Sequence, residues 1–267
     1  MNMNTLLKYN EDWKTLVCCC ISSIVYMFYW KYFSNHFMFP ILCFQAFQMS
    51  VIVHNSAHVH PFRSKLCNKL FLTILTLLSG SPCSLYVPGH NESHHKHLET
   101  EKDMMRTTRM KYKNEFLNLI LFAPTVLPDI IRAERKYMNN IKGVVYCQYL
   151  LETTTYHTFL FALLYINWTK ALLVYFIPTL VGKYMIISLN MLQHYKCDPT
   201  SKYNHSRNFT GPILNFFCFN NGYHTSHHNA PGIHWSLLPK KHYQIENKID
   251  PDLIQENILL YIWRYSR

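Results

Sequence analysis

Histidines at helical spacing constrain this 267-residue chain more than any other feature of its sequence. They form three clusters, with one isolated histidine before the third: His54 and His58; His90, His94 and His95; His194; and His224, His227 and His228. Each residue of an α-helix turns by about 100°, so histidines four positions apart lie on one face, one turn apart. Clusters of this kind are typical of metal sites, and we interpret all nine histidines as metal ligands.

Adjacent histidines within two of the clusters indicate how many ions are bound. On a regular helix the side chains of His94 and His95 diverge by about 100°, as do those of His227 and His228. Such neighbours aim poorly at one ion, but they suit two ions that lie side by side. The sequence therefore predicts a dinuclear site, with coordination positions left open to water or oxygen species.

The composition indicates an integral membrane protein. Charged residues make up 15% of the chain, against about 25% in an average soluble domain. We expect one all-α domain over residues 1–267, with four membrane-spanning helices in two hairpins. The expected spans are 15–33, 37–54, 144–167 and 171–192, and the expected helical cytosolic cap is 55–143 and 195–267. All histidine clusters then lie on one side of the membrane.

Some segments do not fit simple spans. Residues 70–78 are too few to cross, and we interpret them as an interfacial or re-entrant helix. Residues 117–131 contain two prolines and are expected to lie along the membrane surface, while 167–170 are expected to form an external turn. The second hairpin also carries Glu152, His157 and Lys183. They are either functional groups at membrane depth or groups near an interface or internal cavity, and the sequence leaves this open.

Charge and cysteine patterns exclude other classes. The net charge of +11 comes without a dense basic run, recognition-helix pattern or zinc-finger spacing, so we expect no nucleic-acid partner. The nine cysteines are scattered in apolar segments, which is typical of buried thiols facing a reducing compartment. No small-residue cleavage site follows the first apolar segment, so we interpret it as an uncleaved helix.

The number and arrangement of the ligands narrow the choice of metal more than their type does. Imidazole binds zinc, copper, iron and nickel alike. A structural zinc site needs only four ligands, and a zinc protease needs His-Glu-x-x-His, whereas Asn55 occupies the second position here. Soluble di-iron proteins use two Glu-x-x-His motifs on bundle helices, and this chain has no such pair of motifs. An all-histidine dinuclear site beside a membrane indicates iron and the activation of oxygen.

Other polar residues are candidates for orienting the ligands. They are Asn55, His97, Gln193, Asn220, Asn221 and His234, with His60 and His205 as further candidates. For these histidines a surface position or an ordinary polar contact is the competing interpretation. His97 is expected on the same helical face as His90 and His94, whereas His36 and His242 look ordinary.

The three clusters resemble the histidine boxes of membrane fatty acid desaturases and hydroxylases. The matching segments are His54-Asn55-Ser56-Ala57-His58, His90-Asn91-Glu92-Ser93-His94-His95 and His224-Thr225-Ser226-His227-His228, and His194 is similar in placement to the extra histidine of that superfamily. The resemblance covers roughly residues 15–240 and implies four spans and a cytosolic cap that holds two irons. Residues 193–208 are also similar to membrane alkane hydroxylases, which typically have six spans, and 234–239 to bacterial-type desaturase-domain proteins.

The resemblance implies oxygen-dependent desaturation of an acyl lipid at an unactivated carbon–carbon bond. Hydroxylation of a fatty acyl or alkyl chain is the alternative, and a non-catalytic membrane protein that binds metal and lipid is a second alternative. No cytochrome b5 signature such as His-Pro-Gly-Gly is present. We therefore expect a separate electron donor, cytochrome b5-like or ferredoxin-like, and a site that faces the cytosol from the endoplasmic reticulum or a bacterial inner membrane.

Overall fold

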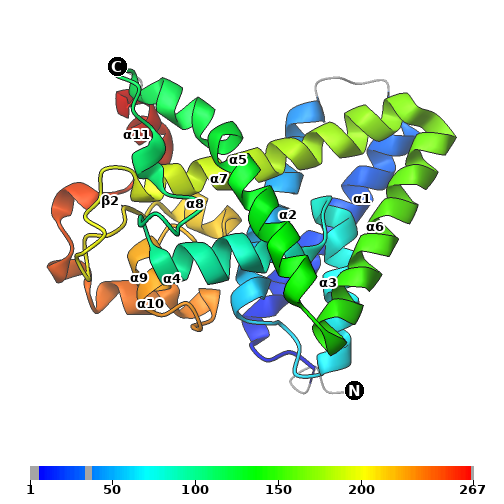
Figure 1. Ribbon diagram of the computed structural model, residues 1–267, viewed down its shortest axis with the longest axis horizontal. Coiled ribbons are helices and arrows are strands. Elements are labelled where there is room, and N and C mark those ends of the chain that lie inside the picture. Colours follow the sequence, from blue (N-terminus) through cyan, green and yellow to red (C-terminus); the bar gives the residue numbers. More distant parts are fainter. Residues whose placement is uncertain (1–5, 34–37, 266–267) are drawn as a thin grey trace. The chain divides into compact units, whose positions relative to one another are not determined.

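The computed structural model describes residues 6–33 and 38–265, which are built mainly of helices (Figure 1). The α-helices are α1 (Trp13–Lys31), α2 (Phe39–His58), α3 (Lys65–Ser79), α4 (His95–His97), α5 (Glu115–Asn140), α6 (Gly143–Lys170), α7 (Ile177–His194), α8 (Pro212–Phe217), α9 (His224–Asn229), α10 (Leu238–Tyr243) and α11 (Ile258–Tyr265). Two π-helices are η5 (Pro88–His94) and η7 (Ala171–Phe176). The short 3-10 helices are η2 (Asn10–Asp12), η4 (Cys83–Leu85), η6 (Thr107–Arg109), η8 (Trp235–Leu237), η9 (Glu246–Lys248) and η10 (Pro251–Leu253). Strands β1 (Asn208–Phe209) and β2 (Ile254–Gln255) pair in parallel.

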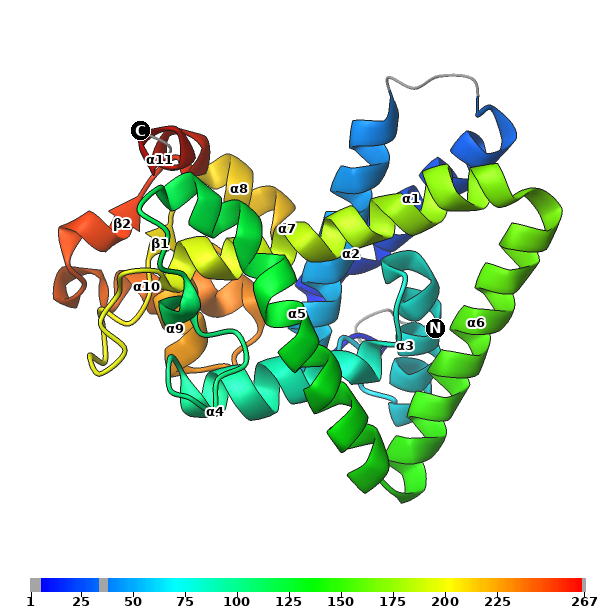
Figure 2. The same ribbon diagram turned by 45° about the horizontal axis from the view of Figure 1, so that its top comes forward.

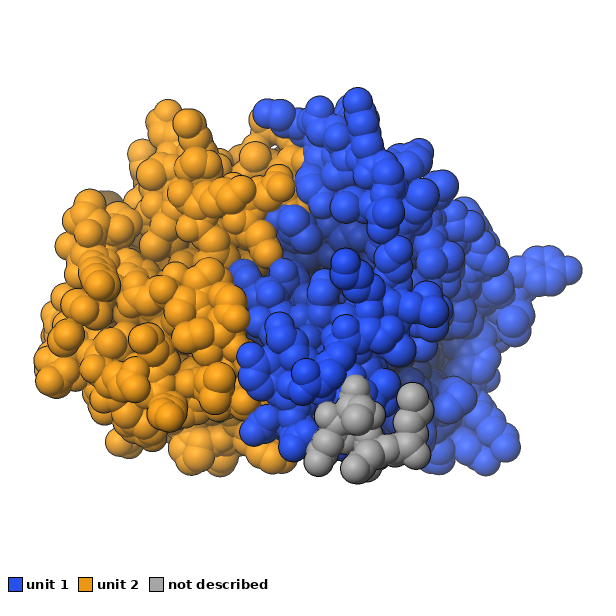
Figure 3. Space-filling model, turned by 90° about the horizontal axis from the view of Figure 1, so that it is seen from below, with its two compact units in different colours: residues 1–87, 136–186 blue, residues 88–135, 187–267 orange. Residues whose placement is uncertain are grey.

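The chain divides into two compact units (Figure 3). Unit 1 consists of residues 1–87 and 136–186, and unit 2 consists of residues 88–135 and 187–267. Unit 1 contains α1, α2, α3, α6 and η7, whereas η5, α4, α8 to α11 and both strands belong to unit 2.

Three helical runs in the described part of the chain are long and apolar enough to cross a membrane: Asn10–Lys31, Glu115–Asn140 and Gly143–His194. A bent pair, Lys65–Ser79 with Cys83–His97, is a fourth candidate, and its parts meet at 84°. The predicted all-α membrane class is therefore confirmed. The run Gly143–His194 contains both spans expected in the second hairpin, and the backbone leaves the helix at Asn167, with φ −162° and ψ 97°.

Two segments differ from the sequence prediction. Helix α2 covers the expected span 37–54 from residue 39 onward, but it is not among the runs apolar enough to cross. It packs against α1, α3 and η7 and buries Gln45, Gln48 and Ser50, and these polar residues lower its hydropathy. Helix α5 continues through both prolines of 117–131 and is long and apolar enough to cross. Residue 37 and the connection 34–36, with His36, lie outside the described residues.

A sharp bend after α3 turns the chain toward the second histidine cluster. Gly80 has φ +73°, and a Cβ added there would lie 2.5 Å from the side chain of Thr179. Both the backbone conformation and the lack of space therefore require glycine. Lys183 in α7 donates a hydrogen bond from Nζ to the Gly80 carbonyl oxygen at 2.6 Å. Lys183, whose role the sequence leaves open, thus stabilises the bend.

Glu152 in α6 holds the other side of this bend. Its fully buried carboxylate accepts hydrogen bonds from the Ser84 backbone N–H and from Gln148 Nε2, each at 2.8 Å. Gln148 also donates to the Lys69 carbonyl oxygen of α3 at 3.1 Å. Helix α6 is thereby tied to both sides of the bend. His157 is exposed, and its Nδ1 lies 2.8 Å from a backbone oxygen of its own helix.

The core of unit 2 lies among α5, the end of α7 and β1. Phe122, Val126, Met191 and Phe209 are fully buried in it. The backbone N–H of Phe209 donates to the Gly222 carbonyl oxygen at 2.9 Å. The core strand therefore holds the segment that leads into the third histidine cluster.

Candidate metal centre

The second histidine cluster lies mostly in the π-helix η5, not in the regular α-helix that the spacing argument assumed. A π-helix has i→i+5 hydrogen bonds, so residues five apart meet more closely than in an α-helix. His90 Nε2 accordingly lies 3.1 Å from His95 Nε2. Because this local winding differs from the α-helical one, the Nε2 atoms of His90 and His94 lie beside different histidines, His95 and His194, instead of acting together from one face.

Four histidines of unit 2 bring their ligand atoms within 4.8 Å of one another: His94, His194, His224 and His228. We call them the four-histidine group. The Nε2 atom of His194 lies 2.9 Å from that of His224, 3.1 Å from that of His228 and 3.2 Å from that of His94. Helices η5, α7 and α9, which are far apart in sequence, thus supply one buried cluster of nitrogen atoms.

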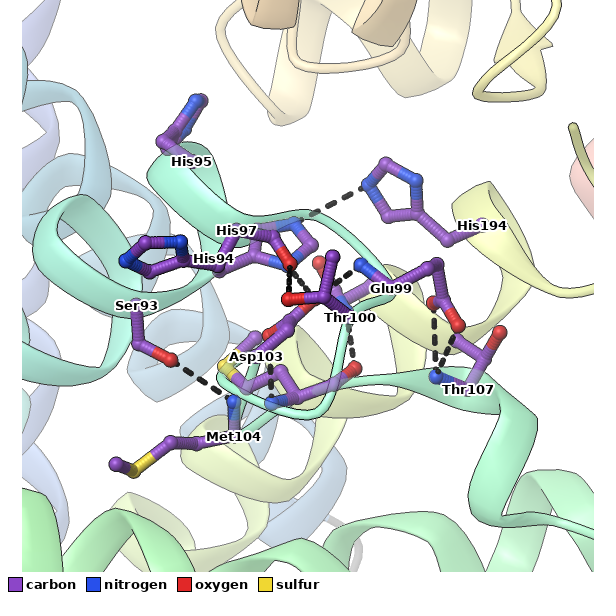
Figure 4. Close-up of polar contacts among 12 residues, drawn as sticks. Ser93, His94, His95, His97, Glu99, Thr100, Asp103, Met104, Thr107 and His194 are labelled. Atoms are coloured by element: carbon purple, nitrogen blue, oxygen red, sulfur yellow. Dashed lines mark hydrogen bonds and ion pairs between the residues drawn. The ribbon is translucent and has the colours of Figure 1, made fainter. Parts of the chain in front are cut away.

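Two buried acceptors orient rings of this group. Asp103 Oδ2 lies 3.0 Å from His94 Nδ1, and neither side chain is exposed (Figure 4). The backbone oxygen of His205 lies 3.0 Å from His194 Nδ1. Because carboxylate and carbonyl oxygens can only accept, each Nδ1 carries the proton. As neutral imidazoles, His94 and His194 then present their Nε2 lone pairs to each other.

These facing lone pairs fit a metal ion. Two neutral imidazoles cannot hydrogen-bond to each other through two bare Nε2 atoms, and burying those atoms together is unfavourable without a cation. Burial, strengthened by the neighbouring His224, lowers the pKa of His228 well below its ordinary value. Ligation requires a neutral imidazole. The donor set of the four-histidine group therefore suits a transition-metal ion.

Asp103 is a site residue that the sequence prediction missed. Burial raises the pKa of its carboxyl, but His94 and hydrogen bonds from the backbone N–H groups of Glu99 and Met105 outweigh burial and lower it. The ionised carboxylate fixes the ring of His94 and raises its basicity as a ligand. The available signal was an acidic residue nine positions after His94, which is weak because Glu99 and Glu101 lie nearer in sequence.

Three other histidines of unit 2 also meet through Nε2: His90, His95 and His227. We call them the three-histidine group. The Nε2 atom of His95 lies 3.1 Å from that of His90 and 3.1 Å from that of His227. Figure 4 shows His95 directed away from the contact between His94 and His194. In both adjacent pairs, therefore, one histidine belongs to the four-histidine group and its neighbour to the three-histidine group.

The first histidine cluster lies in unit 1, at the end of α2. The rings of His54 and His58 have centroids 5.2 Å apart, as expected for residues one helical turn apart. His54 Nδ1 lies 3.2 Å from Asn55 Oδ1, and the His54 ring centroid lies 6.0 Å from that of Tyr86. Asn55 thus contacts a candidate ligand, as expected of an orienting residue.

A buried polar network fixes α9, which carries the third cluster. The Thr225 hydroxyl donates to the Ser206 carbonyl oxygen at 3.1 Å and accepts from Asn208 Nδ2 at 2.8 Å. The Thr225 backbone N–H donates to Asn208 Oδ1 at 3.0 Å. A helix of six residues gains little stability from its own hydrogen bonds. Its orientation therefore depends on these contacts.

Gln193, Asn220 and Asn221, three further candidate orienting residues, belong to unit 2. Gln193 Nε2 donates to the Asn221 carbonyl oxygen at 2.9 Å, and Asn220 Nδ2 donates to that of Trp235 at 3.2 Å. They hold the loop before α9. Four further histidines make ordinary contacts. The backbone oxygen of His97 accepts a hydrogen bond from the Thr100 hydroxyl, and His234 Nδ1 lies 2.8 Å from Ser236 Oγ. His60 is exposed, whereas His242 is buried and packs on Tyr223.

Known proteins of one family match this chain. The sequence model of the family described as fatty acid desaturase matches residues 29–257. The sphingolipid delta(4)-desaturase DES1 of Mus musculus is 26% identical over 196 residues, covering 72% of this chain and 59% of the mouse protein. A sphingolipid delta(4)-desaturase of Komagataella phaffii (strain GS115 / ATCC 20864) is 24% identical over 267 residues, covering 83% of this chain and 71% of that protein. The chain thus spans less than two thirds of the length of the mouse relative.

Proposed function

This chain belongs to the fatty acid desaturase family, and we propose that it is a membrane oxidoreductase that introduces a double bond into a lipid hydrocarbon chain. Two relatives are named as sphingolipid desaturases, and we propose a sphingolipid as the substrate class here. The observation that carries the proposal is the four-histidine group, whose Nε2 atoms meet at 2.9–3.2 Å. Hydroxylation of the same chain by the same centre is the alternative.

We propose two iron ions as the cofactor. His94, His194, His224 and His228 would hold one ion. The three-histidine group would hold the other, together with His54 and His58, whose spacing in α2 suits a shared ligand role. Nine imidazoles without thiolate or carboxylate ligands suit iron, and bound iron supplies the activation of dioxygen with two added electrons.

The overall reaction balances with one dioxygen, two electrons and two protons. Desaturation removes two hydrogen atoms from adjacent methylene groups and releases two waters, whereas hydroxylation inserts one oxygen atom and releases one water. Burial lowers the pKa of His228. The Nδ1–H groups of His94 and His194 donate to Asp103 and to the His205 carbonyl, and burial excludes bulk water. A separate one-electron donor, cytochrome b5-like or ferredoxin-like, would supply the electrons.

We propose that the site faces the cytosol, in the endoplasmic reticulum or a bacterial inner membrane. All nine cysteines are free thiols, which agrees with a reducing compartment. The basic balance of the chain, +11, would favour docking of an acidic electron donor.

Lipid profiling tests the proposal. Cells that lack sphingolipid desaturation would express the wild-type chain, His227→Ala or the control His157→Ala, which changes an exposed histidine outside both groups. New double bonds with wild type and His157→Ala, lost with His227→Ala, are expected. New hydroxylated lipids would favour the alternative. A metal-loaded protein that leaves the lipid profile unchanged would favour a non-catalytic metal- and lipid-binding role.

A further inference from the structure

Unit 1 contains an apolar cavity that is lined only by its own residues. Its volume is about 540 Å³, which lies within the roughly 300–1,000 Å³ of small-molecule sites. The walls come from α1, α3, α6 and η7. Helix α3 packs against α1 and α6, and η7 packs against the same two helices; Figure 2 shows α1, α3 and α6 of this unit. A cavity of this size is larger than the small voids that close-packed interiors leave.

The lining suits a hydrocarbon chain and not a polar head group. Trp30, Phe159 and Leu163 are among the apolar walls. Three hydroxyl groups lie at the wall: those of Ser23 and Tyr175 already donate to backbone oxygens, at 2.9 Å and 2.8 Å, and that of Tyr26 has no partner among the described residues. A polar group inside the cavity would lose its hydrogen bonds to water and gain at most one, to the Tyr26 hydroxyl.

The cavity opens toward a lipid-facing surface. Met27 and Ile74 line it and are 64% and 56% exposed. Met27 belongs to the run Asn10–Lys31, which is long and apolar enough to cross a membrane. In a bilayer these exposed side chains meet lipid, so a chain can enter from the membrane without passing through water.

Two lysines lie beside one end of the cavity. Lys170 Nζ donates to the backbone oxygen of Trp30 at 2.8 Å, and Lys31 is in the last turn of α1. Tryptophan and lysine at the ends of membrane helices mark the head-group level. An ammonium group has three donors, so Lys170 can also bind a phosphate oxygen of a lipid head group.

We propose that unit 1 binds a phospholipid, with one acyl chain in this cavity and the phosphate beside Lys170 and Lys31. The acyl chain would fill the cavity and make dispersion contacts with its apolar walls. This inference rests on the membrane placement of unit 1 and is independent of the proposed reaction.

Photo-cross-linking of the full chain in lipid nanodiscs tests the inference. The probe is phosphatidylcholine with a diazirine in one acyl chain, and the cross-linked peptides are mapped by mass spectrometry. We expect cross-links at Trp30, Phe159 or Leu163. Leu163→Trp fills the cavity and should lower them about tenfold. The control Phe161→Trp adds bulk at a side chain of α6 that is 65% exposed and should leave them unchanged.

Val174→Phe fills the cavity from η7 instead of α6. Loss of cross-links in both filling variants, with an unchanged gel-filtration profile, supports the site. Equal labelling of wild type and of either correctly folded filling variant overturns it. Lys170→Gln should weaken labelling by the phosphatidylcholine probe more than by a diacylglycerol probe, and an equal effect on both overturns the head-group contact. A photoactivatable ceramide that labels the cavity and is not displaced by phosphatidylcholine would also overturn the proposed occupant.

Discussion

The Nδ1 atom of His94 lies 3.0 Å from Oδ2 of Asp103, and both side chains are fully shielded from solvent. The contact places the proton on Nδ1 and directs Nε2 toward His194. The same carboxylate accepts the backbone N–H groups of Glu99 and Met105 at 2.9 and 2.8 Å. The loop that contains Glu99, Asp103 and Met105 therefore lies against the Nδ1 side of His94, the side turned away from His194.

Removing this carboxylate should weaken metal binding. We expect Asp103→Ala to lower metal affinity by about 10- to 100-fold, the usual effect of losing a partner behind a ligating histidine. The measurement is iron retained per chain during competition with a chelator. Asp252→Asn, an exposed substitution, is the control. Equal retention in all three proteins would contradict the role given to Asp103.

Gly222 should not tolerate a side chain. An added Cβ would lie 2.0 Å from the backbone oxygen of Phe209, so either β1 or the start of α9 must move. We expect Gly222→Ala to destabilise the protein by at least about 2 kcal/mol, seen as a lower midpoint of thermal unfolding in detergent. Gly232→Ala is a matched control, because a Cβ added at Gly232 would have no other atom within 4 Å. A similar midpoint for both variants would refute this steric argument.

The Thr225 hydroxyl should stabilise the third cluster. Thr225→Val keeps the shape but leaves Asn208 Nδ2 without its 2.8 Å acceptor in a buried site. The expected cost is about 1–3 kcal/mol, measured by denaturant or thermal unfolding. Thr225→Ser retains the hydroxyl and should lose less. If the serine and valine variants are equally stable, the hydrogen-bond network does not hold α9.

Glu152 should act as a structural clamp. Glu152→Leu removes the acceptor of the buried Ser84 N–H and of Gln148, so we expect a loss of about 1–3 kcal/mol. Protease resistance of the bend between α3 and η4 should fall with it. His157→Ala, on the exposed face of the same helix, should change neither property. Wild-type stability of Glu152→Leu would mean that the bend is held by other contacts.

Helical spacing predicted part of the candidate metal site because side chains on one short helix are positioned by local geometry. His224 and His228 belong to one group, and His227 to the other. The pairing of His90 with His95 depends on the π-helix, which no spacing rule for an α-helix foresees. Asp103 could not be selected either, since its contact with His94 is made by the path of a polar loop.

For the membrane helices, too, local sequence predicts only part of the structure. Apolar runs predicted α1 and the pair α6 and α7 because lipid selects long hydrophobic stretches. In α2, Gln45 and Gln48 are buried by the protein itself and do not face lipid. The hydropathy of α2 therefore does not show whether the helix lies in a membrane. Because of its two prolines, residues 117–131 were expected to lie along the membrane surface, yet α5 continues through Pro124 and Pro128 and is long and apolar enough to cross.

The number of metal ions per chain tests the central claim most directly. Metal analysis of the purified protein should find about two iron ions per chain. The folded chain brings the histidine donors together, so metal binding is coupled to folding. His228→Ala, in the four-histidine group, and His227→Ala, in the three-histidine group, should each retain about one. His97→Ala, outside both groups, should retain about two. A single zinc ion in the wild type, or no metal at all, would contradict the account.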